Sequence, residues 1–258
     1  MADGHLANIV PLRGRVSEAE WRTRVDLAAL YRLVALEGWD DMVFTHISAR
    51  APGPEHHFLI NPFGVYFDEV TASSLVKVNR QGEIVMDSPY GINAAGYVIH
   101  SAIHGAREDA LFVMHLHTDC GVAVCAQKSG LLPLSQHAMI VRPHLAYHDY
   151  EGIAFNLDER ARLVQDLGGK SLMMLRNHGT LATGATAGEA WLGMFHLERA
   201  CKMQVLALSA GPDGVLLAPE GAQAEVLKVV GGGLGSMSEL PWPGLLRRLD
   251  RRSPGYDA

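Results

Sequence analysis

The sequence lacks the long apolar runs that a membrane-spanning helix needs, since no stretch of about 18 uninterrupted apolar residues occurs in its 258 positions. Its first residues also lack the charged start and apolar centre of a signal peptide, so we expect no secretory signal. Basic residues are scarce as well, because 22 Lys and Arg stand against 28 Asp and Glu. A formal net charge of -6 does not favour nucleic acid as a partner, and we expect neither a nucleic-acid nor a membrane partner.

Cysteine is rare, and phosphate-binding motifs are missing. The three cysteines are an odd number, and Cys120, Cys125 and Cys201 lie in apolar patterns, so we expect buried, reduced thiols in a cytoplasmic chain. No G-x-G-x-x-G follows the first expected strand and no Walker sequence occurs, which leaves dinucleotide and nucleotide sites without support. The length suits one generous domain, and we expect a single domain over residues 1–258.

Helical and strand-like patterns alternate along the chain. Ser17, Asn156 and Thr186 are each followed three residues later by Glu, and these capping boxes predict helices that end at Gly38, at Gly168 and at about Ser209. The other expected helices cover 71–76, 93–105, 118–128 and 222–230, and the other expected strands cover 44–48, 57–60, 82–85, 138–141, 146–151 and 182–184. Because helices alternate with strands that turn back as hairpins, we predict a sheet of mixed direction between helical layers.

A last apolar stripe at helical spacing follows the glycine triplet at 231–233. It consists of Trp242, Leu245, Leu246 and Leu249. A stripe of this kind packs back on its own core or docks on a neighbouring subunit, and the sequence leaves both interpretations open.

Two histidines separated by one residue end the apolar run Leu111–Thr118. Because side chains alternate along a strand with a rise of about 3.3 Å per residue, His115 and His117 should project from one face, roughly 7 Å apart at the backbone. A second apolar run, Ser171–Gly179, delivers His178 into a glycine-containing turn. Three histidines with coordination positions left open are typical of a catalytic rather than a closed structural metal site. The sequence therefore predicts a metal-dependent enzyme.

Other histidines compete for this role. With 13 histidines in the chain, an H-x-H pair can also arise by chance. The histidines of such a pair would then only form hydrogen bonds at the edge of a core. His100 and His104 lie four residues apart on one helix face, a spacing that can bind metal, but no acid follows His100 as in zincins. His46, in an expected strand, could reach a pocket or form a sheet-edge hydrogen bond. The loop histidines that could act as acid or base near neutral pH are His137, His144 and His148.

Five motifs together resemble the class II aldolase/adducin family, most closely its adducin-like branch. In order they are Ile92–Arg107, Val113–Thr118, Gly130–Gln136, Ala146–Gly152 and Leu175–Gly179. The match covers about residues 20–210, and a C-terminal helical tail at about 219–258 follows it. The resemblance implies a three-layer α/β/α sandwich with a central mixed, largely antiparallel sheet, commonly in a homotetramer. It also implies retro-aldol cleavage of a sugar phosphate, with a divalent ion on the residues His115, His117 and His178.

Three segments depart from the aldolase pattern. Aldolases of the family carry Ser-Ser-Glu ahead of the histidine that resembles His100, with the Glu as acid/base, whereas this chain has Ala94-Ala95-Gly96. The phosphate-binding Gly-Asn-x-Ser segment is replaced by Thr45–Ser48, and the Thr-Pro-Ser-Gly turn by Asn61–Gly64. A site without that carboxylate and those phosphate donors is not expected to cleave sugar phosphates by the usual route. The departures favour an unphosphorylated substrate or a different reaction.

Our first hypothesis is a metal-dependent lyase that cleaves a carbon–carbon bond, by aldol or decarboxylation chemistry, in a small oxygenated, metal-chelating substrate. We expect His46, Asn93 and His100 to contact the substrate or transfer protons. Zinc is the expected ion, with Fe, Mn or Co as alternatives, because imidazole ligands suit several metals. A second hypothesis is a non-catalytic adducin-like association or cytoskeletal module, which the histidine triplet and the lack of a Lys-rich tail oppose. A third is a mononuclear non-haem iron oxygenase on the same scaffold.

Overall fold

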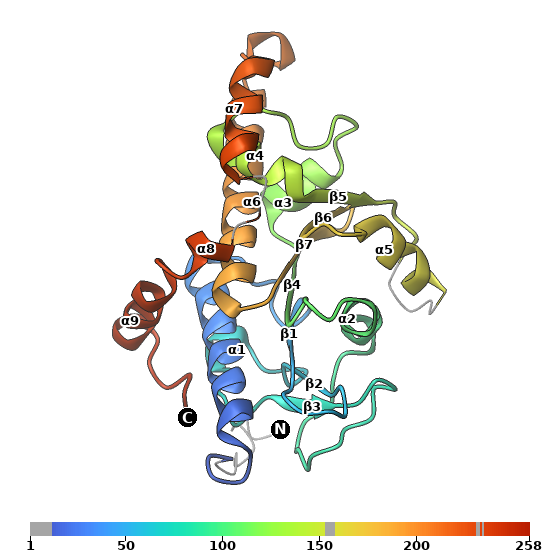
Figure 1. The fold of residues 1–258 in the computed structure, drawn as a ribbon, viewed down its shortest axis with the longest axis vertical. Coiled ribbons are helices and arrows are strands. Elements are labelled where there is room, and N and C mark those ends of the chain that lie inside the picture. Colours follow the sequence, from blue (N-terminus) through green and yellow to red (C-terminus); the bar gives the residue numbers. More distant parts are fainter. Residues whose placement is uncertain (1–11, 153–157, 231–232, 234) are drawn as a thin grey trace, which may run out of the picture.

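One seven-stranded sheet organises the chain (Figure 1). The computed structural model describes residues 12–152, 158–230, 233 and 235–258. In spatial order the strands are β3 (Val76–Val78), β2 (Phe58–Ile60), β1 (His46–Arg50), β4 (Phe112–Leu116), β7 (Gly179–Gly184), β6 (Leu172–Leu175) and β5 (Leu145–His148). Of these neighbours, β5 and β6 are parallel and the other pairs are antiparallel. The predicted mixed, largely antiparallel sheet is confirmed.

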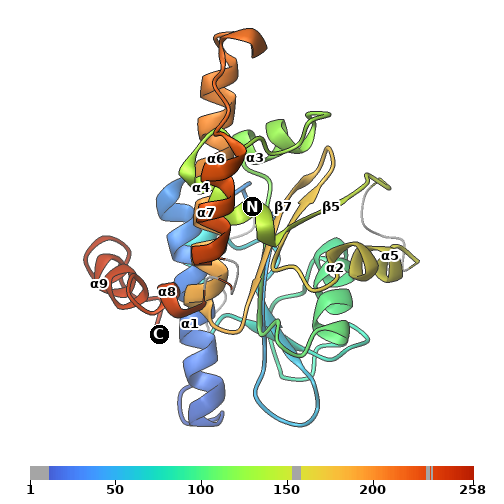
Figure 2. The ribbon, with the colours of Figure 1, turned by 45° about the horizontal axis from the view of Figure 1, so that its top comes forward.

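Helices cover both faces of the sheet, which gives three layers (Figures 1 and 2). One face carries α1 (Glu18–Glu37) and α6 (Ala187–Leu208), and α3 (Asp119–Cys125) and α4 (Gln136–Val141) pack against α6. The other face carries α2 (Ala94–Ala106) and α5 (Glu159–Leu167), which pack against each other. The arrangement is the predicted α/β/α sandwich.

The alternation of side chains along β4 decides which face its histidine takes. The apolar residues that join the core beneath α1 and α6 are Phe112, Met114 and Leu116. Val113 joins the core beneath α2 and α5, so His115, two residues on, also lies on the α2 side. Directly opposed residues of neighbouring strands share a face, which places His46, the partner of His115, and Ser48, the partner of Val113, on the same side. The apolar pattern therefore directs these polar residues into the layer between sheet and α2.

Local signals explain several helix ends. Ser17 Oγ accepts a hydrogen bond from the Glu20 amide at 3.1 Å at the start of α1, and Gly38, in the left-handed region with φ 68°, ends it. Thr186 caps α6 in the same way as Ser17 caps α1. The cap position of α5 is Asp158, and the predicted cap Asn156 lies outside the described residues.

Three predicted elements are wrong. Residues 71–76 form a turn followed by β3, because the Ser74 hydroxyl bonds the Thr71 backbone and closes the turn locally. Residues 138–141 belong to helix α4 instead of a strand, since Ser135 Oγ accepts from the Ala138 amide and starts a helix in a run too short for periodicity to classify. Residues 82–85 contribute an isolated bridge from Ile84 to β3 and no strand.

The C-terminal part contains α7 (Glu220–Val230), α8 (Gly235–Ser238) and α9 (Trp242–Arg252). Short 3-10 helices are η1 (Phe67–Glu69), η2 (Arg142–His144) and η3 (Pro212–Gly214). Leu249 of α9 is fully buried in the core beneath α1, and Arg248 Nη1 lies 2.6 Å from the Glu37 carboxylate. The tail stripe therefore packs on its own chain. Among the described helices, none is both long enough and apolar enough to cross a membrane.

Candidate metal centre

Three histidine side chains come together where the C-terminal end of β4 lies beside the N-terminal end of β7. β4 carries His115 as its penultimate residue and His117 just beyond it, and His178 lies in the turn between β6 and β7. The ring centroids are 4.8 Å apart for His115 and His117, 4.8 Å for His115 and His178, and 4.9 Å for His117 and His178. One ring nitrogen of each residue lies within 4.8 Å of the other two. Ligand nitrogens about 2.1 Å from one zinc ion are about 3.4 Å from each other, so the cluster has the size of a single-ion site.

The turn that carries His178 depends on its neighbours. Asn177 has φ 57°, a left-handed conformation that asparagine tolerates better than most residues. At Gly179, a Cβ atom would collide with the Leu116 carbonyl oxygen and would lie 3.0 Å from the ring of His117. The Asn-His-Gly sequence thus lets β7 approach β4 closely enough for the imidazoles to meet.

Hydrogen bonds on the outer side of the cluster decide which nitrogens face inward. His115 Nδ1 lies 3.1 Å from the Thr180 carbonyl oxygen, and His117 Nδ1 lies 3.1 Å from Asp41 Oδ2. Because a carbonyl and a carboxylate accept, each Nδ1 carries a hydrogen, and in the neutral form of each ring Nε2 has a lone pair. These two Nε2 atoms are 3.0 Å apart.

Two lone pairs that face each other at this distance repel unless they share a cation. Metal-binding histidines characteristically donate their other N–H to a carboxylate or a backbone carbonyl, as His115 and His117 do here. Burial, followed by the neighbouring imidazoles, holds the pKa of His115 well below its usual value, and the same causes lower the pKa of His178 to about 4. Both are neutral at pH 7, which is the form that binds metal. The donor set therefore fits a divalent cation.

A buried carboxylate behind the cluster links its two segments. Glu198 of α6 is 4% exposed and accepts hydrogen bonds from Thr180 Oγ1 at 2.6 Å and from the Thr118 hydroxyl. Thr118 follows His117 directly, and the Thr180 carbonyl accepts from His115. Glu198 therefore restrains both segments that carry the histidines. Burial raises the pKa of this carboxyl.

The two acidic residues that support the cluster were not predicted from the sequence. Asp41 lies 76 positions from His117, and Glu198 lies 80 positions from Thr118, so no local spacing relates them. One usable signal exists: Glu198 lies four residues after Met194 and three before Cys201, on the buried face of α6, where an acid needs buried partners.

The histidines predicted to contact substrate lie in a polar row between β1 and α2. His46 and Ser48 alternate on β1, while Gly96, His100 and His104 recur every four residues along α2. Ser48 Oγ lies 2.6 Å from His100 Nδ1 and 2.7 Å from His104 Nε2. The ring centroids of His46 and His100 are 6.0 Å apart. The competing pair, His100 and His104, is thus engaged with Ser48 and does not join the three-histidine cluster.

The His46 ring packs directly against Gly96, on the side where a side chain at position 96 would project. A Cβ atom at position 96 would lie 2.5 to 2.7 Å from three atoms of the His46 ring, closer than Cβ atoms approach other atoms. The ring therefore occupies the volume that a side chain at 96 would need. With the His46 ring in this place, position 96 has no room for a side chain larger than that of glycine.

Asn93 and the loop histidines His137, His144 and His148 also lie outside the three-histidine cluster. Asn93 is half-buried directly before α2, and its carbonyl accepts from the Tyr97 amide at 3.1 Å. His144 Nε2 donates to the Val230 carbonyl at 2.8 Å, and His148 Nδ1 lies 2.7 Å from Asp166 Oδ2. The ring of His137 lies tilted against that of His196, with ring centroids 5.4 Å apart.

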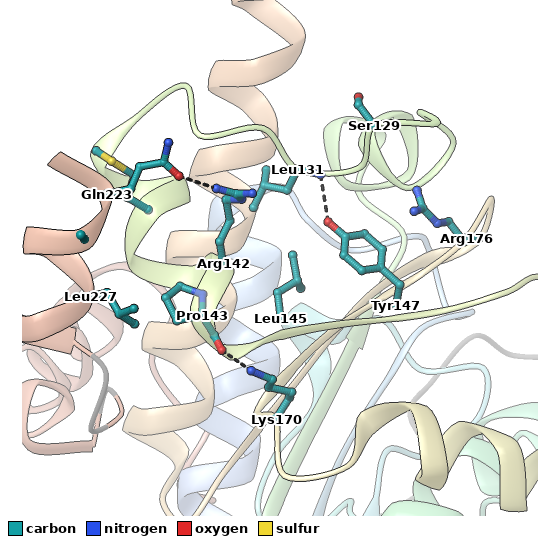
Figure 3. Close-up of a pocket in the computed structure, with 12 residues that line it drawn as sticks. Ser129, Leu131, Arg142, Pro143, Leu145, Tyr147, Lys170, Arg176, Gln223 and Leu227 are labelled. Carbon is teal, nitrogen blue, oxygen red and sulfur yellow. Dashed lines mark hydrogen bonds between the residues drawn. The ribbon is translucent and has the colours of Figure 1, made fainter. Parts of the chain in front are cut away.

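A cavity of about 640 Å³ lies between α4, β5 and α7 (Figure 3). Figure 3 shows Arg142 bonded to Gln223 and Lys170 bonded to the Pro143 carbonyl, with Arg176 beside the Tyr147 ring. The residues that line it, all from the described part of the chain, do not include the three clustered histidines. This cavity is therefore distinct from the histidine cluster.

Comparisons with known proteins agree with the fold and the motifs. Residues 25–205 match the family model described as Class II Aldolase and Adducin N-terminal domain. A putative aldolase class 2 protein of Caulobacter vibrioides is 69% identical over 256 residues, which cover 99% of each chain. Alpha-adducin of Rattus norvegicus is 44% identical over 230 residues, which cover 86% of this chain and 31% of the adducin. The solved structure of L-fuculose 1-phosphate aldolase from Glaciozyma antarctica PI12 has a TM-score of 0.78 and 26% identity, with 96% of each chain covered.

Proposed function

This chain belongs to the class II aldolase and adducin family, and from that premise we propose that it is a metal-dependent lyase. It would cleave a carbon–carbon bond, by aldol or decarboxylation chemistry, in a small oxygenated substrate that carries no phosphate. The observation that carries the proposal is the approach of Nε2 of His115 and Nε2 of His117 to 3.0 Å, with the ring of His178 beside both.

The three imidazoles would hold one divalent ion, for which zinc is our first choice and Fe, Mn or Co are alternatives. A zinc ion held by three protein ligands keeps a position for another ligand. The bound ion supplies a Lewis acid that polarises a carbonyl oxygen. The chain's own contribution is orientation: Asp41 and the Thr180 carbonyl turn two imidazoles inward, and Glu198 restrains the segments that carry them.

The polar row supports a substrate without phosphate. Burial, and then His117 and His178, lower the pKa of His46 to about 3, so this ring brings no positive charge at pH 7. A phosphate group is bound most strongly by charged donors or by several backbone amides, which a neutral imidazole does not replace. We propose that His46, Asn93 and His100 contact the substrate in place of the absent Glu.

One observation favours a second function. The chain is 44% identical to alpha-adducin over 230 residues, so a non-catalytic association module also has support within the family. The outward hydrogen bonds of His115 and His117 argue for the lyase, because an association surface has no need of two inward-facing lone pairs.

Metal analysis and a substrate screen on one preparation separate these functions. We expect protein purified without chelator to contain about one divalent ion per chain. We also expect it to turn over at least one compound in a screen of hydroxy acids, keto acids and aldols. The control variant His57→Ala, a half-buried histidine outside the cluster, should behave like the wild type.

Each other outcome of that experiment has a defined meaning. Full metal content without turnover of any compound would favour the association module. Iron together with oxygen consumption would favour the oxygenase. A chain that binds no divalent ion would refute the lyase proposal.

A further inference from the structure

Three ring nitrogens between β1 and α2 are buried without a hydrogen-bond partner. They are both nitrogens of His46 and Nε2 of His100. Buried polar atoms in proteins are nearly always paired, so three unpaired nitrogens in one place point to a small polar ligand that completes them. The chemistry of that ligand follows from which of these nitrogens carry hydrogen.

A chain of hydrogen bonds that begins at a backbone carbonyl determines which ring nitrogen of His100 carries the hydrogen. His104 Nδ1 lies 3.0 Å from the Ala110 carbonyl oxygen, which only accepts, so Nδ1 carries the hydrogen and Nε2 has a lone pair. The Ser48 hydroxyl must then donate its single hydrogen to His104 Nε2 at 2.7 Å. Ser48 Oγ is left as the acceptor for His100 Nδ1 at 2.6 Å. His100 Nδ1 therefore carries the hydrogen, and His100 Nε2 presents a lone pair.

Burial supports this assignment because it keeps both rings neutral. It lowers the pKa of His104 to about 3 and holds the pKa of His100 well below its usual value. A neutral His100 with hydrogen on Nδ1 has none on Nε2, so it can only accept at that atom. The neutral His46 ring has one nitrogen that donates and one that accepts.

The rings of His46 and His100 lie edge to face, with centroids 6.0 Å apart. One oxygen atom bonded to a nitrogen of each ring would supply partners to unpaired atoms of both through two hydrogen bonds of about 2.8 Å. That oxygen must donate a hydrogen to His100 Nε2 and can accept one from His46. A hydroxyl group satisfies both requirements, whereas a carboxylate or phosphate oxygen has no hydrogen to give.

We propose that His46 and His100 bind a hydroxyl group of the substrate, and that Ser48 and His104 are positioning residues that fix His100 as a hydrogen-bond acceptor. This inference rests on the proposed lyase function and narrows its substrate to hydroxy-carbonyl compounds with an un-ionised hydroxyl at this point. Ser48 and His104 act through His100 and do not touch the substrate. Water offers the same O–H chemistry, so the test must separate water from a substrate hydroxyl.

The first measurement is the tautomer of His100 in metal-free protein. Nitrogen NMR of protein labelled with ¹⁵N-histidine reports which ring nitrogen carries hydrogen, and the His100 signal is assigned by its loss in His100→Gln. We expect hydrogen on Nδ1 in the wild type and a mixture of tautomers in Ser48→Ala. The matched control is Ser101→Ala on the same helix, whose hydroxyl bonds the Val98 carbonyl, and its spectrum should match the wild type. Hydrogen on Nε2 of His100 in the wild type would overturn the assignment.

The second measurement compares two probes that differ by one hydroxyl. With zinc-loaded protein, hydroxyacetone is expected to bind about tenfold more tightly than acetone and to shift the His46 and His100 signals, because only hydroxyacetone can pair both rings. In Ser48→Ala the preference should fall to less than about threefold, since His100 no longer presents a fixed acceptor. Equal binding of the two probes by the wild type would overturn the proposal. An unchanged preference in Ser48→Ala would also overturn it, because hydroxyacetone would then owe its tighter binding to chelation of the zinc ion by its two oxygens.

Failure of this inference is distinguishable from failure of the lyase proposal. The tautomer experiment uses metal-free protein, so its result does not depend on zinc binding at the cluster. A chain that shows the expected tautomer and binds no zinc would refute the lyase function, while the assignment of Ser48 and His104 would stand. A chain that binds zinc but prefers neither probe would refute the hydroxyl site alone.

Discussion

Replacing His178 with alanine is expected to lower the affinity for the divalent ion more than about 100-fold and to abolish turnover of any substrate that the wild type accepts. Loss of an outer partner of a metal ligand typically costs 10- to 100-fold in affinity, and loss of the ligand itself costs more. His178 is half-buried in a turn, so the fold should persist. Competition with a chromophoric chelator measures the affinity, and far-UV circular dichroism checks the fold.

The matched comparison uses two other variants. His57→Ala removes a histidine outside the cluster and should bind the ion like the wild type. Asp41→Ala removes the carboxylate that orients His117, so its affinity should fall between those of the wild type and His178→Ala. Unchanged affinity in His178→Ala would place the ion elsewhere in the molecule.

Replacing Gly96 with alanine is expected to destabilise the fold by about 1–3 kcal/mol, the usual cost of overpacking a filled interior. The added Cβ meets the His46 ring at 2.5 Å, and this ring is 3% exposed and has little room to move. Gly105→Ala is the control on the same helix. A Cβ at Gly105 meets nothing within 4 Å, so helix propensity should make that variant more stable by up to about 1 kcal/mol. Urea denaturation of both variants measures the difference.

A double variant tests whether the ring causes the loss. His46→Ala/Gly96→Ala removes the collision, so its free energy of unfolding should exceed the value expected from adding the two single effects. Strict additivity would show that the His46 ring and a side chain at position 96 do not compete for space.

The sequence predicted the fold class well, because it depends on local patterns. The Ser17 and Thr186 caps and the apolar alternation of β4 are readable from neighbouring residues, and they set where His115 and His117 project. The sequence predicts a strand at residues 138–141 because a short apolar run fits the period of a strand as well as that of a helix, whereas in the structure the Ser135 cap starts a helix there.

The supporting parts of the site were beyond the sequence because they depend on contacts between distant segments. The orientation of the His117 ring depends on its hydrogen bond to Asp41. The link between the two segments that carry the histidines depends on the hydrogen bonds of Glu198 in α6. The residues at positions 46 and 96 that depart from the aldolase pattern can be identified in the sequence. Only the packing of α2 on β1 shows that the His46 ring fills the space that a side chain at position 96 would need. Long-range geometry of this kind leaves no spacing signal in a single chain.

Anomalous X-ray diffraction from crystals of zinc-loaded protein would show whether the three histidines bind the ion. We expect one strong peak per chain, about 2.1 Å from Nε2 of His115, from Nε2 of His117 and from a ring nitrogen of His178, with oxygen ligands in the remaining positions. A peak at another place, or no peak in protein that is saturated with zinc in solution, would contradict this expectation.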